Sequence, residues 1–202
     1  MQTLIEHART FPARISPRRE HFERLALGQR PQALFIACSD SRVVPSQITG
    51  AQPGDIFELR TAGHIVPRHR DEAACGISAT LEYAIQVLDV PDIVVFGHSH
   101  CGAVEGMLRP ATTRGLPQVR RWLGQANPLP KMHPHDPAPP GAEDVRTAAQ
   151  RHLVNQLGNL RTHPCVSRRL AAGDLRLHAW FYTVDTGEVL TWRHDVRAFR
   201  PL

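Results

Sequence analysis

Three side chains that can bind a metal follow two apolar stretches of the sequence. Cys38 comes directly after "ALFIA", and His98 and Cys101 stand three residues apart after "DIVVFG". Two thiolates and one imidazole are the ligand set of a catalytic zinc site whose fourth position stays open for water. Cysteine also packs often as a small buried hydrophobe, so the spacing alone leaves packing open as the alternative.

An acid and a base lie close to the first of these residues. Asp40 and Arg42 belong to the stretch "CSDSR". A guanidinium that binds a carboxylate with two hydrogen bonds keeps it ionised and fixes its orientation. Asp40 could then accept a hydrogen bond from a hydroxide on the metal, whereas the alternative is an ordinary loop salt bridge. We expect the two remaining cysteines, Cys75 and Cys165, to be packing residues in helices, with a redox role as the alternative.

The elements that position these residues alternate along the chain. A short, continuously apolar strand is predicted at 33–37, a second strand at 54–60 and a third, buried strand at 92–97. A helix is predicted at 71–90, and a further helix opens with "CGAVEGML". Buried strands that alternate with helices predict an α/β fold with a mostly parallel central sheet flanked by helices. Ligands bind beyond the carboxyl ends of such strands, so "CSDSR" and "GHSHCG" should meet at one edge of the sheet.

The two ends of the chain carry further elements. Two amphipathic helices in residues 1–30 predict an N-terminal helical arm, with Gly28 as its end. Helices are predicted at 143–162 and within "HPCVSRRLAAG", then a strand at 175–184 and an antiparallel edge strand at "VLTWR". The segment 127–141 is rich in proline and predicts a surface loop, in which His133, His135 and Asp136 lack partner cysteines for a metal site.

Composition narrows the class of protein. A length of 202 residues with 42% hydrophobic and 21% charged residues fits one soluble domain, 1–202. No apolar run approaches the roughly 20 residues of a membrane helix. The start "MQTLIEHARTF" lacks the apolar core of a signal peptide, so we expect a cytoplasmic protein. The net charge of +5 comes from scattered arginines, and only 6% of residues are aromatic, which argues against nucleic-acid binding.

The pair "CSDSR" and "GHSHCG" closely resembles the β-class carbonic anhydrases. "QPGDIFELRTAGHIVP", "LEYAIQVLDVPDIVVFGHSHCGAV" and "NLRTHPCVSRRLAAGDLRLHAWFY" are also similar to that family, nearest to its plant-type and cyanate-operon branch. The resemblance implies a carbonate dehydratase that hydrates CO2 reversibly to bicarbonate and a proton by attack of a zinc-bound hydroxide. It implies one Zn²⁺ per subunit on Cys38, His98 and Cys101.

The resemblance also implies roles for further residues. Asp40 and Arg42 match the catalytic dyad of the family, and Asp40 becomes a fourth zinc ligand only in a closed state. Gln29 matches the plant-type glutamine that donates to substrate oxygen, while Phe57 and Tyr83 match the two aromatic residues of the CO2 pocket. We expect the backbone N–H of Gly102, at a helix start, to assist in stabilising bicarbonate, and His100 to be a rim residue.

One residue that distinguishes the branches and one departure from the family pattern bear on regulation and assembly. Phe35 stands where the other branch has a tryptophan of an inhibitory bicarbonate site, so we expect no strong bicarbonate switch. "RTAGH" stands where the family often has "RNAGN", and we expect Thr61 and His64 to affect the interface-facing loop and not the metal. Family members build the pocket from two subunits with N-terminal helices around the partner, which implies a homodimer or homotetramer.

Two other functions stay open at this point. A hydrolase of carbonyl sulfide or carbon disulfide could use the same zinc site, because both substrates are linear electrophiles like CO2. A non-enzymatic zinc module is the other alternative, although the five residues of the implied site are all present.

Overall fold

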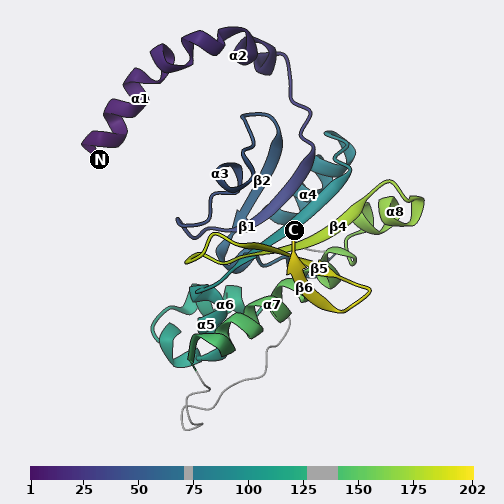
Figure 1. Ribbon diagram of the computed structural model, residues 1–202. Helices are drawn as coiled ribbons and strands as arrows, with labels where there is room; N and C mark the ends of the chain where they lie inside the picture. The colour runs from purple at the N-terminus through teal and green to yellow at the C-terminus, as the bar shows by residue number, and fades with distance from the viewer. Residues whose placement is uncertain (71–74, 127–140) are drawn as a thin grey trace.

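A single twisted sheet organises the chain in the computed structural model, which describes residues 1–70, 75–126 and 141–202 (Figure 1). Its strand order is β2-β1-β3-β4-β5-β6. The neighbouring pairs from β2 to β4 are parallel, and those from β4 to β6 are antiparallel. The predicted α/β class with a mostly parallel sheet is therefore confirmed. The strands are β1 (Ala33–Cys38), β2 (Ile56–Thr61), β3 (Asp92–His98), β4 (Arg176–Tyr182), β5 (Val189–Arg193) and β6 (Ala198–Pro201).

Helices cover one face of the sheet with a large apolar core. On this face α7 contacts β3 and β4, α4 contacts β2, and α8 contacts α4. Leu34 and Ile36 of β1 lie in this core, where they are fully buried. The helices are α1 (Gln2–Ile15), α2 (Arg19–Ala26), α3 (Pro45–Thr49), α4 (Gly76–Gln86), α5 (Gly102–Leu108), α6 (Pro117–Leu123), α7 (Gly141–Leu160) and α8 (Pro164–Ala172), with short 3-10 turns at Ser16–Arg18, Ala62–His64 and Pro110–Thr113.

The opposite face of the sheet carries a smaller apolar cluster. Phe35, Val94 and Phe96 belong to it, with Trp180 packed against them. Ile48 of the short helix α3 also packs against this cluster. Because strand side chains alternate between faces, residues 33, 35 and 37 of β1 point here while 34, 36 and 38 point to the larger core.

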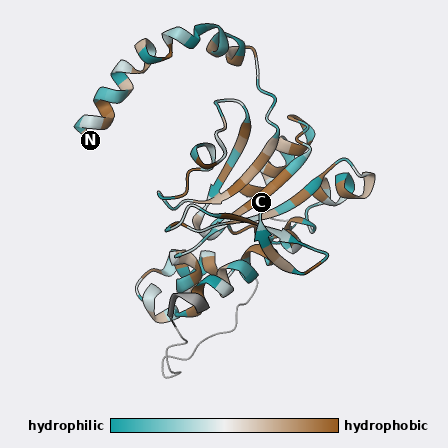
Figure 2. Cartoon of the chain, viewed as in Figure 1, coloured by the Kyte–Doolittle hydropathy of each residue, from teal (hydrophilic) through white to brown (hydrophobic). Residues whose placement is uncertain are grey.

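The two N-terminal helices extend away from the rest of the chain (Figure 1). Neither α1 nor α2 contains a buried residue. Apolar and polar residues are interspersed along this arm (Figure 2), and Leu4, Phe11 and Leu27 are 66%, 44% and 90% exposed. An amphipathic segment with exposed apolar side chains has its apolar face unpartnered within one chain.

The predicted helix 71–90 is shorter in the structure, where α4 begins at Gly76 and ends at Gln86. Cys75 has an extended backbone and caps the start of the helix. Beyond the other end of α4, Asp89 adopts a left-handed conformation with φ of 53°, through which a right-handed helix cannot continue. Residues 71–74 lie outside the described residues. The same holds for residues 127–140 of the predicted Pro-rich loop 127–141.

The prediction that "VLTWR" is the edge strand was wrong, because β6 pairs with it on the outside. The sequence prediction assigned no element to residues 194–202. Phe199 of β6 packs against Trp192 and Phe181, with ring centroids 5.3 and 6.0 Å away. Pro201 suits an edge position, because its missing N–H removes no bond to an inner strand.

The topology brings the chemistry-bearing ends of two strands together. β1 and β3 are parallel neighbours, and β1 ends at Cys38 while β3 ends at His98. The predicted meeting of the two motifs at one sheet edge is therefore confirmed. None of the helices in the described ranges combines the length and the hydropathy needed to cross a bilayer.

Candidate metal centre

Cys38, His98 and Cys101 form one buried group at the carboxyl edge of the sheet. Their ligand atoms all lie within 4.8 Å of one another. Cys38 ends β1, His98 ends β3, and Cys101 is the residue that precedes α5. Because each of these positions is set by the end of an element that packs in the core, the three side chains converge without a long flexible loop.

The imidazole of His98 is oriented for metal binding. Its Nδ1–H donates to the carbonyl oxygen of Ser99 over 2.8 Å. The carbonyl is only an acceptor, so the proton of the neutral ring resides on Nδ1. Nε2 is buried and has no hydrogen-bond partner among the described residues. A metal-binding histidine has this arrangement, with one nitrogen held by a second-shell group and the other free for the ion.

The two thiols influence each other's ionisation. A hydrogen bond from Cys101 is the main cause that lowers the pKa of Cys38. The hydrogen bond with Cys38 and burial together raise the pKa of Cys101. Deprotonating both thiols therefore leaves two negative charges in a buried space, which a divalent cation would neutralise. The donor set and its protonation chemistry fit zinc.

Asp40 and Arg42 form the predicted pair beside this group. Arg42 donates from Nε to Oδ1 over 3.0 Å and from Nη2 to Oδ2 over 2.8 Å. The hydrogen bonds from Arg42 hold the pKa of Asp40 well below its usual range. Arg42 Nη2 also donates to the carbonyl oxygen of His100 over 3.0 Å, which ties the pair to the loop between the two metal-binding positions. Both oxygens of Asp40 are thus directed to Arg42.

Arg60 holds the loop that carries Asp40, a role that the sequence prediction missed. Its Nη2 donates to the carbonyl oxygens of Cys38, Asp40 and Val43 over 2.7, 3.0 and 2.7 Å. These three carbonyls lie on one turn of chain, so a single side chain from β2 fixes its path. Arg60 opens the stretch "RTAGH", and its place at the carboxyl end of a strand was the signal that could have identified it.

The predicted substrate residues divide into one that lies at the metal group and three that do not. Gly102 begins α5 directly after Cys101. Phe57 pairs with Leu34, four positions before Cys38, which places it about 13 Å along the strand from the edge. Tyr83 packs on Phe57 with ring centroids 6.1 Å apart. Gln29 is exposed and precedes β1, so it lies at the amino end of that strand.

The remaining polar residues near the edge have separate surroundings. His100 has a left-handed backbone with φ of 56°, and its Nε2 lies 3.5 Å from Asp185 at the surface. His64 is fully buried against His152, with ring centroids 4.8 Å apart. Cys165 is buried in α8, and Cys75 is half-buried with its sulfur 3.6 Å from Ser78 Oγ. Neither thiol is in the metal-binding group.

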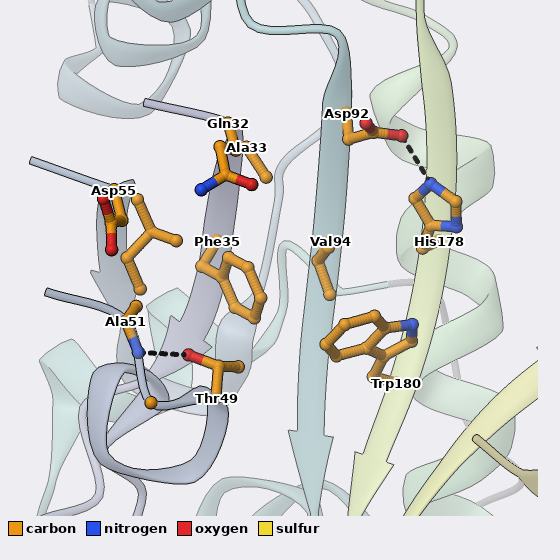
Figure 3. Close-up of a pocket in the computed structure, with 12 residues that line it drawn as sticks. Gln32, Ala33, Phe35, Thr49, Ala51, Asp55, Asp92, Val94, His178 and Trp180 are labelled. Atoms are coloured by element: carbon orange, nitrogen blue, oxygen red, sulfur yellow. Dashed lines mark hydrogen bonds and ion pairs between the residues drawn. The ribbon is translucent and has the colours of Figure 1, made fainter. Parts of the chain in front are cut away.

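A separate pocket of about 470 Å³ lies on the sheet face that carries the smaller apolar cluster. Phe35, Val94 and Trp180 come from three neighbouring strands and line it side by side (Figure 3). At the amino ends of these strands His178 Nε2 lies 2.7 Å from Asp92 Oδ1. The metal-binding residues are on the other face or at the far edge, so this pocket is distinct from them.

Comparisons with known proteins agree with this geometry. The family model described as carbonic anhydrase matches residues 33–189. A carbonic anhydrase of Pseudomonas aeruginosa is 44% identical over 172 residues, which cover 85% of this chain and 78% of that protein. The solved structure of the β-carbonic anhydrase CcaA has a TM-score of 0.89 at 38% identity and covers 100% of this chain and 99% of its own. A structure from a study of two tetrameric β-carbonic anhydrases of Sordaria macrospora has a TM-score of 0.71 at 27% identity, covering 94% of each chain.

Proposed function

This chain belongs to the β-class carbonic anhydrase family, and we infer that it catalyses the zinc-dependent, reversible hydration of carbon dioxide to bicarbonate and a proton. The observation that carries this inference is the buried group of Cys38, His98 and Cys101, whose ligand atoms lie within 4.8 Å of one another. That group stands at the carboxyl edge of the sheet, where α/β proteins bind their ligands.

We propose that these three residues hold one Zn²⁺ per subunit. When bound, zinc acidifies water and so supplies a nucleophile near neutral pH. His98 offers its free Nε2, and the two sulfurs bind as thiolates, which requires that both thiols lose their protons. Two thiols this close would oxidise to a disulfide in an oxidising compartment, which favours a reducing, cytoplasmic location.

Asp40 accepts a hydrogen bond from the attacking water in this proposal. Its lowered pKa keeps it ionised over the whole working range, so it is an acceptor and not a proton donor. Arg42 positions Asp40 through two hydrogen bonds and is itself held by the His100 carbonyl. Because the pair is engaged in the structure, Asp40 acts beside the metal site and not as a fourth ligand.

The CO2 pocket requires a second copy of the chain. Phe57 and Tyr83 lie next to each other but far along the strand from Cys38 in the same chain. Gln29 lies beyond them, on the exposed segment before β1. We propose that a partner subunit brings its aromatic pair to the metal edge, where Gly102 N–H and a glutamine at position 29 bind the developing bicarbonate oxygens.

The N-terminal arm, residues 1–30, is the element we propose to join the subunits. It exposes Leu4 and Phe11 in one chain, while the pocket in Figure 3, beside the short helix α3, leaves Trp180 only half-buried on the opposite sheet face. Burying an amphipathic helix of one copy on the other would remove both apolar surfaces from water. Related β-carbonic anhydrases of Sordaria macrospora are tetrameric, so either a dimer or a tetramer is consistent with this contact.

The arm proposal predicts that assembly and turnover fall together. Because Leu4 and Phe11 contribute nothing to the buried core of their own chain, the double substitution Leu4→Glu and Phe11→Glu should leave the subunit folded. Light scattering should then show a smaller species, and stopped-flow CO2 hydration should show lower activity. A fully active monomer would contradict both the arm contact and the shared pocket.

We also propose that this enzyme belongs to the branch without an inhibitory bicarbonate site. Phe35 lacks the indole N–H that a tryptophan would offer, and its ring is packed against Phe96 and Trp180. Initial rates of CO2 hydration at pH 7.5 should therefore fall hyperbolically with added bicarbonate, as for simple product inhibition. A sigmoidal loss of activity would contradict this assignment.

Hydration of CO2 is tested directly by a stopped-flow assay with a pH indicator. We expect turnover that a chelator removes and added zinc restores, and that exceeds hydrolysis of carbonyl sulfide on the same preparation. Turnover of carbonyl sulfide alone would assign the same site to the other substrate.

A further inference from the structure

We propose that Trp122 and His152 are positioning residues for the zinc-binding thiolate of Cys38. Between them they hold the turn Ala62–His64 so that the backbone N–H of Gly63 points at the Cys38 sulfur. This inference rests on the proposed role of Cys38 as a zinc ligand. Neither Trp122 nor His152 belongs to the group of ligands, and each acts through the turn.

The contact that they support is a hydrogen bond from the backbone to sulfur. Gly63 N–H donates to Cys38 Sγ over 3.3 Å in a buried setting. Gly63 has a φ of 72°, and a Cβ at this position would lie 2.7 Å from the Cβ of Ala103 in α5. Glycine therefore allows the turn to lie against α5, beside the second thiol.

Trp122 strengthens this contact from the other end of the same peptide group. Its indole Nε1–H donates to the carbonyl oxygen of Ala62 over 2.8 Å. The Ala62 carbonyl and the Gly63 N–H belong to one peptide group, so a donor at the oxygen makes the N–H a better donor to sulfur. The hydrogen bond from Trp122 to this peptide group thus strengthens the hydrogen bond from the peptide group to Cys38.

His152 fixes the next peptide of the turn. Its Nε2 lies 3.0 Å from the Gly63 carbonyl oxygen, which only accepts, so Nε2 carries the proton. The lone pair on Nδ1 then accepts from Gln156 Nε2 over 3.2 Å. Gln156 Oε1 in turn accepts the backbone N–H of Val66 over 2.9 Å. Every group in this network has one role, so the tautomer of His152 is determined.

The two residues come from different helices, which gives the turn two independent anchors. Trp122 belongs to α6, and His152 belongs to α7. Without either anchor the Gly63 N–H is less well aimed, and the Cys38 sulfur retains more electron density. A thiolate with more electron density has filled sulfur orbitals of higher energy, and it would donate more charge to a bound metal. Water on that metal would then be less acidic.

The test uses cobalt in place of zinc, because thiolate-to-cobalt charge-transfer absorption reports on the sulfur directly. Trp122→Phe removes the N–H and keeps an aromatic ring. Trp192→Phe is the matched control, because Trp192 lies on the distant strand β5 and its indole donates to His194, just beyond that strand. We expect Trp122→Phe to shift the charge-transfer band to longer wavelength, while the Trp192→Phe band coincides with that of the wild type.

Two further readouts separate positioning from general destabilisation. In chelator competition, Trp122→Phe should bind zinc about threefold to tenfold more weakly, because the turn no longer holds the Cys38 sulfur in place. This loss, which outweighs the greater charge on sulfur, is smaller than the 10–100-fold typical of direct second-shell partners. The midpoint of its pH–rate profile should move to higher pH. A second pair of variants tests the other anchor, where His152→Leu should shift the cobalt band and His152→Gln, which restores a donor, should reverse part of that shift.

The outcomes distinguish this inference from the proposed function. A wild-type cobalt protein without thiolate charge-transfer absorption would overturn the ligand assignment itself. A wild-type band that neither Trp122→Phe nor His152→Leu moves, with zinc affinity unchanged, would overturn the positioning role alone.

Discussion

The buried histidine at position 64 gives the fold a dependence on pH that can be measured. Its side chain is fully buried, and neither ring nitrogen has a hydrogen-bond partner within the described ranges. Burial, followed by the nearby His152 and His98, lowers the pKa of His64 well below 6.5. The ring therefore stays neutral in the folded protein at a pH where the unfolded chain is protonated.

The sign and size of the effect follow from this difference in proton uptake. Above pH 6.5 the ring is neutral in both states, so His64 does not make stability depend on pH. Below that value only the unfolded chain binds the proton, and the free energy of unfolding falls by about 1.4 kcal/mol per pH unit. Integrated from pH 7.5 down to pH 5, the loss is about 2 kcal/mol for this one ring.

The substitution His64→Asn isolates the contribution of His64 to the pH dependence of the free energy of unfolding. Asparagine tolerates the left-handed backbone at this position, where φ is 46°, and it does not titrate. Urea unfolding of both proteins at equal zinc saturation, followed by tryptophan fluorescence, gives the free energy of unfolding at each pH. His152 and His163, whose pKa values burial also lowers, are present in both proteins and cancel in the difference.

We expect the wild type to lose about 2 kcal/mol more than His64→Asn between pH 7.5 and pH 5. The difference between the two curves should be flat above pH 7. Parallel curves over the whole range would show that His64 takes up a proton in the folded state, which would refute the reasoning from its burial.

Three more substitutions test other parts of the site. Arg42→Gln should lower kcat at least about tenfold, because it removes the charge-assisted contact that positions Asp40. The midpoint of the pH–rate profile should not move, because Asp40 stays ionised; a shifted midpoint in the stopped-flow assay would contradict this. Gly63→Ala should destabilise the protein by about 1–3 kcal/mol more than Gly173→Ala, which has a similar φ but open space around it, as measured by urea unfolding. Cys75→Ser should keep turnover within about twofold of the wild type, because its thiol lies outside the candidate metal-binding group; a large loss in the stopped-flow assay would assign that thiol a role.

The meeting of the three candidate metal ligands could be predicted because it depends on simple features of the fold. Cys38 and His98 end apolar strands, and adjacent parallel strands present their carboxyl ends at one edge. Cys101 follows His98 within one short loop. Asp40 and Arg42 are two residues apart, so their pairing required no knowledge of the tertiary structure.

Other parts of the site depend on contacts that sequence patterns do not carry. The bond from Gly63 to Cys38 needs a left-handed turn whose path is set by α5, α6 and α7 together. The position of Arg60 at the end of a strand indicates a place near the site, but not the three carbonyl oxygens to which it donates. The strand β6 is short, and its assignment depends on the packing of Phe199 on Trp192.

The separation of Phe57 from Cys38 illustrates a further limit. The family resemblance places both at one pocket, but they lie four strand positions apart along the sheet of a single chain. The proposed second subunit would reconcile the two, and its position on the chain cannot be derived from strand and helix patterns.

The most direct test of the central claim is zinc content and CO2 hydration measured on the same sample of wild type and Cys101→Ala. We predict one zinc per subunit and rapid turnover in the wild type, and the loss of both in the variant. A Cys101→Ala protein that hydrates CO2 at the wild-type rate without bound zinc would contradict the assignment of this centre.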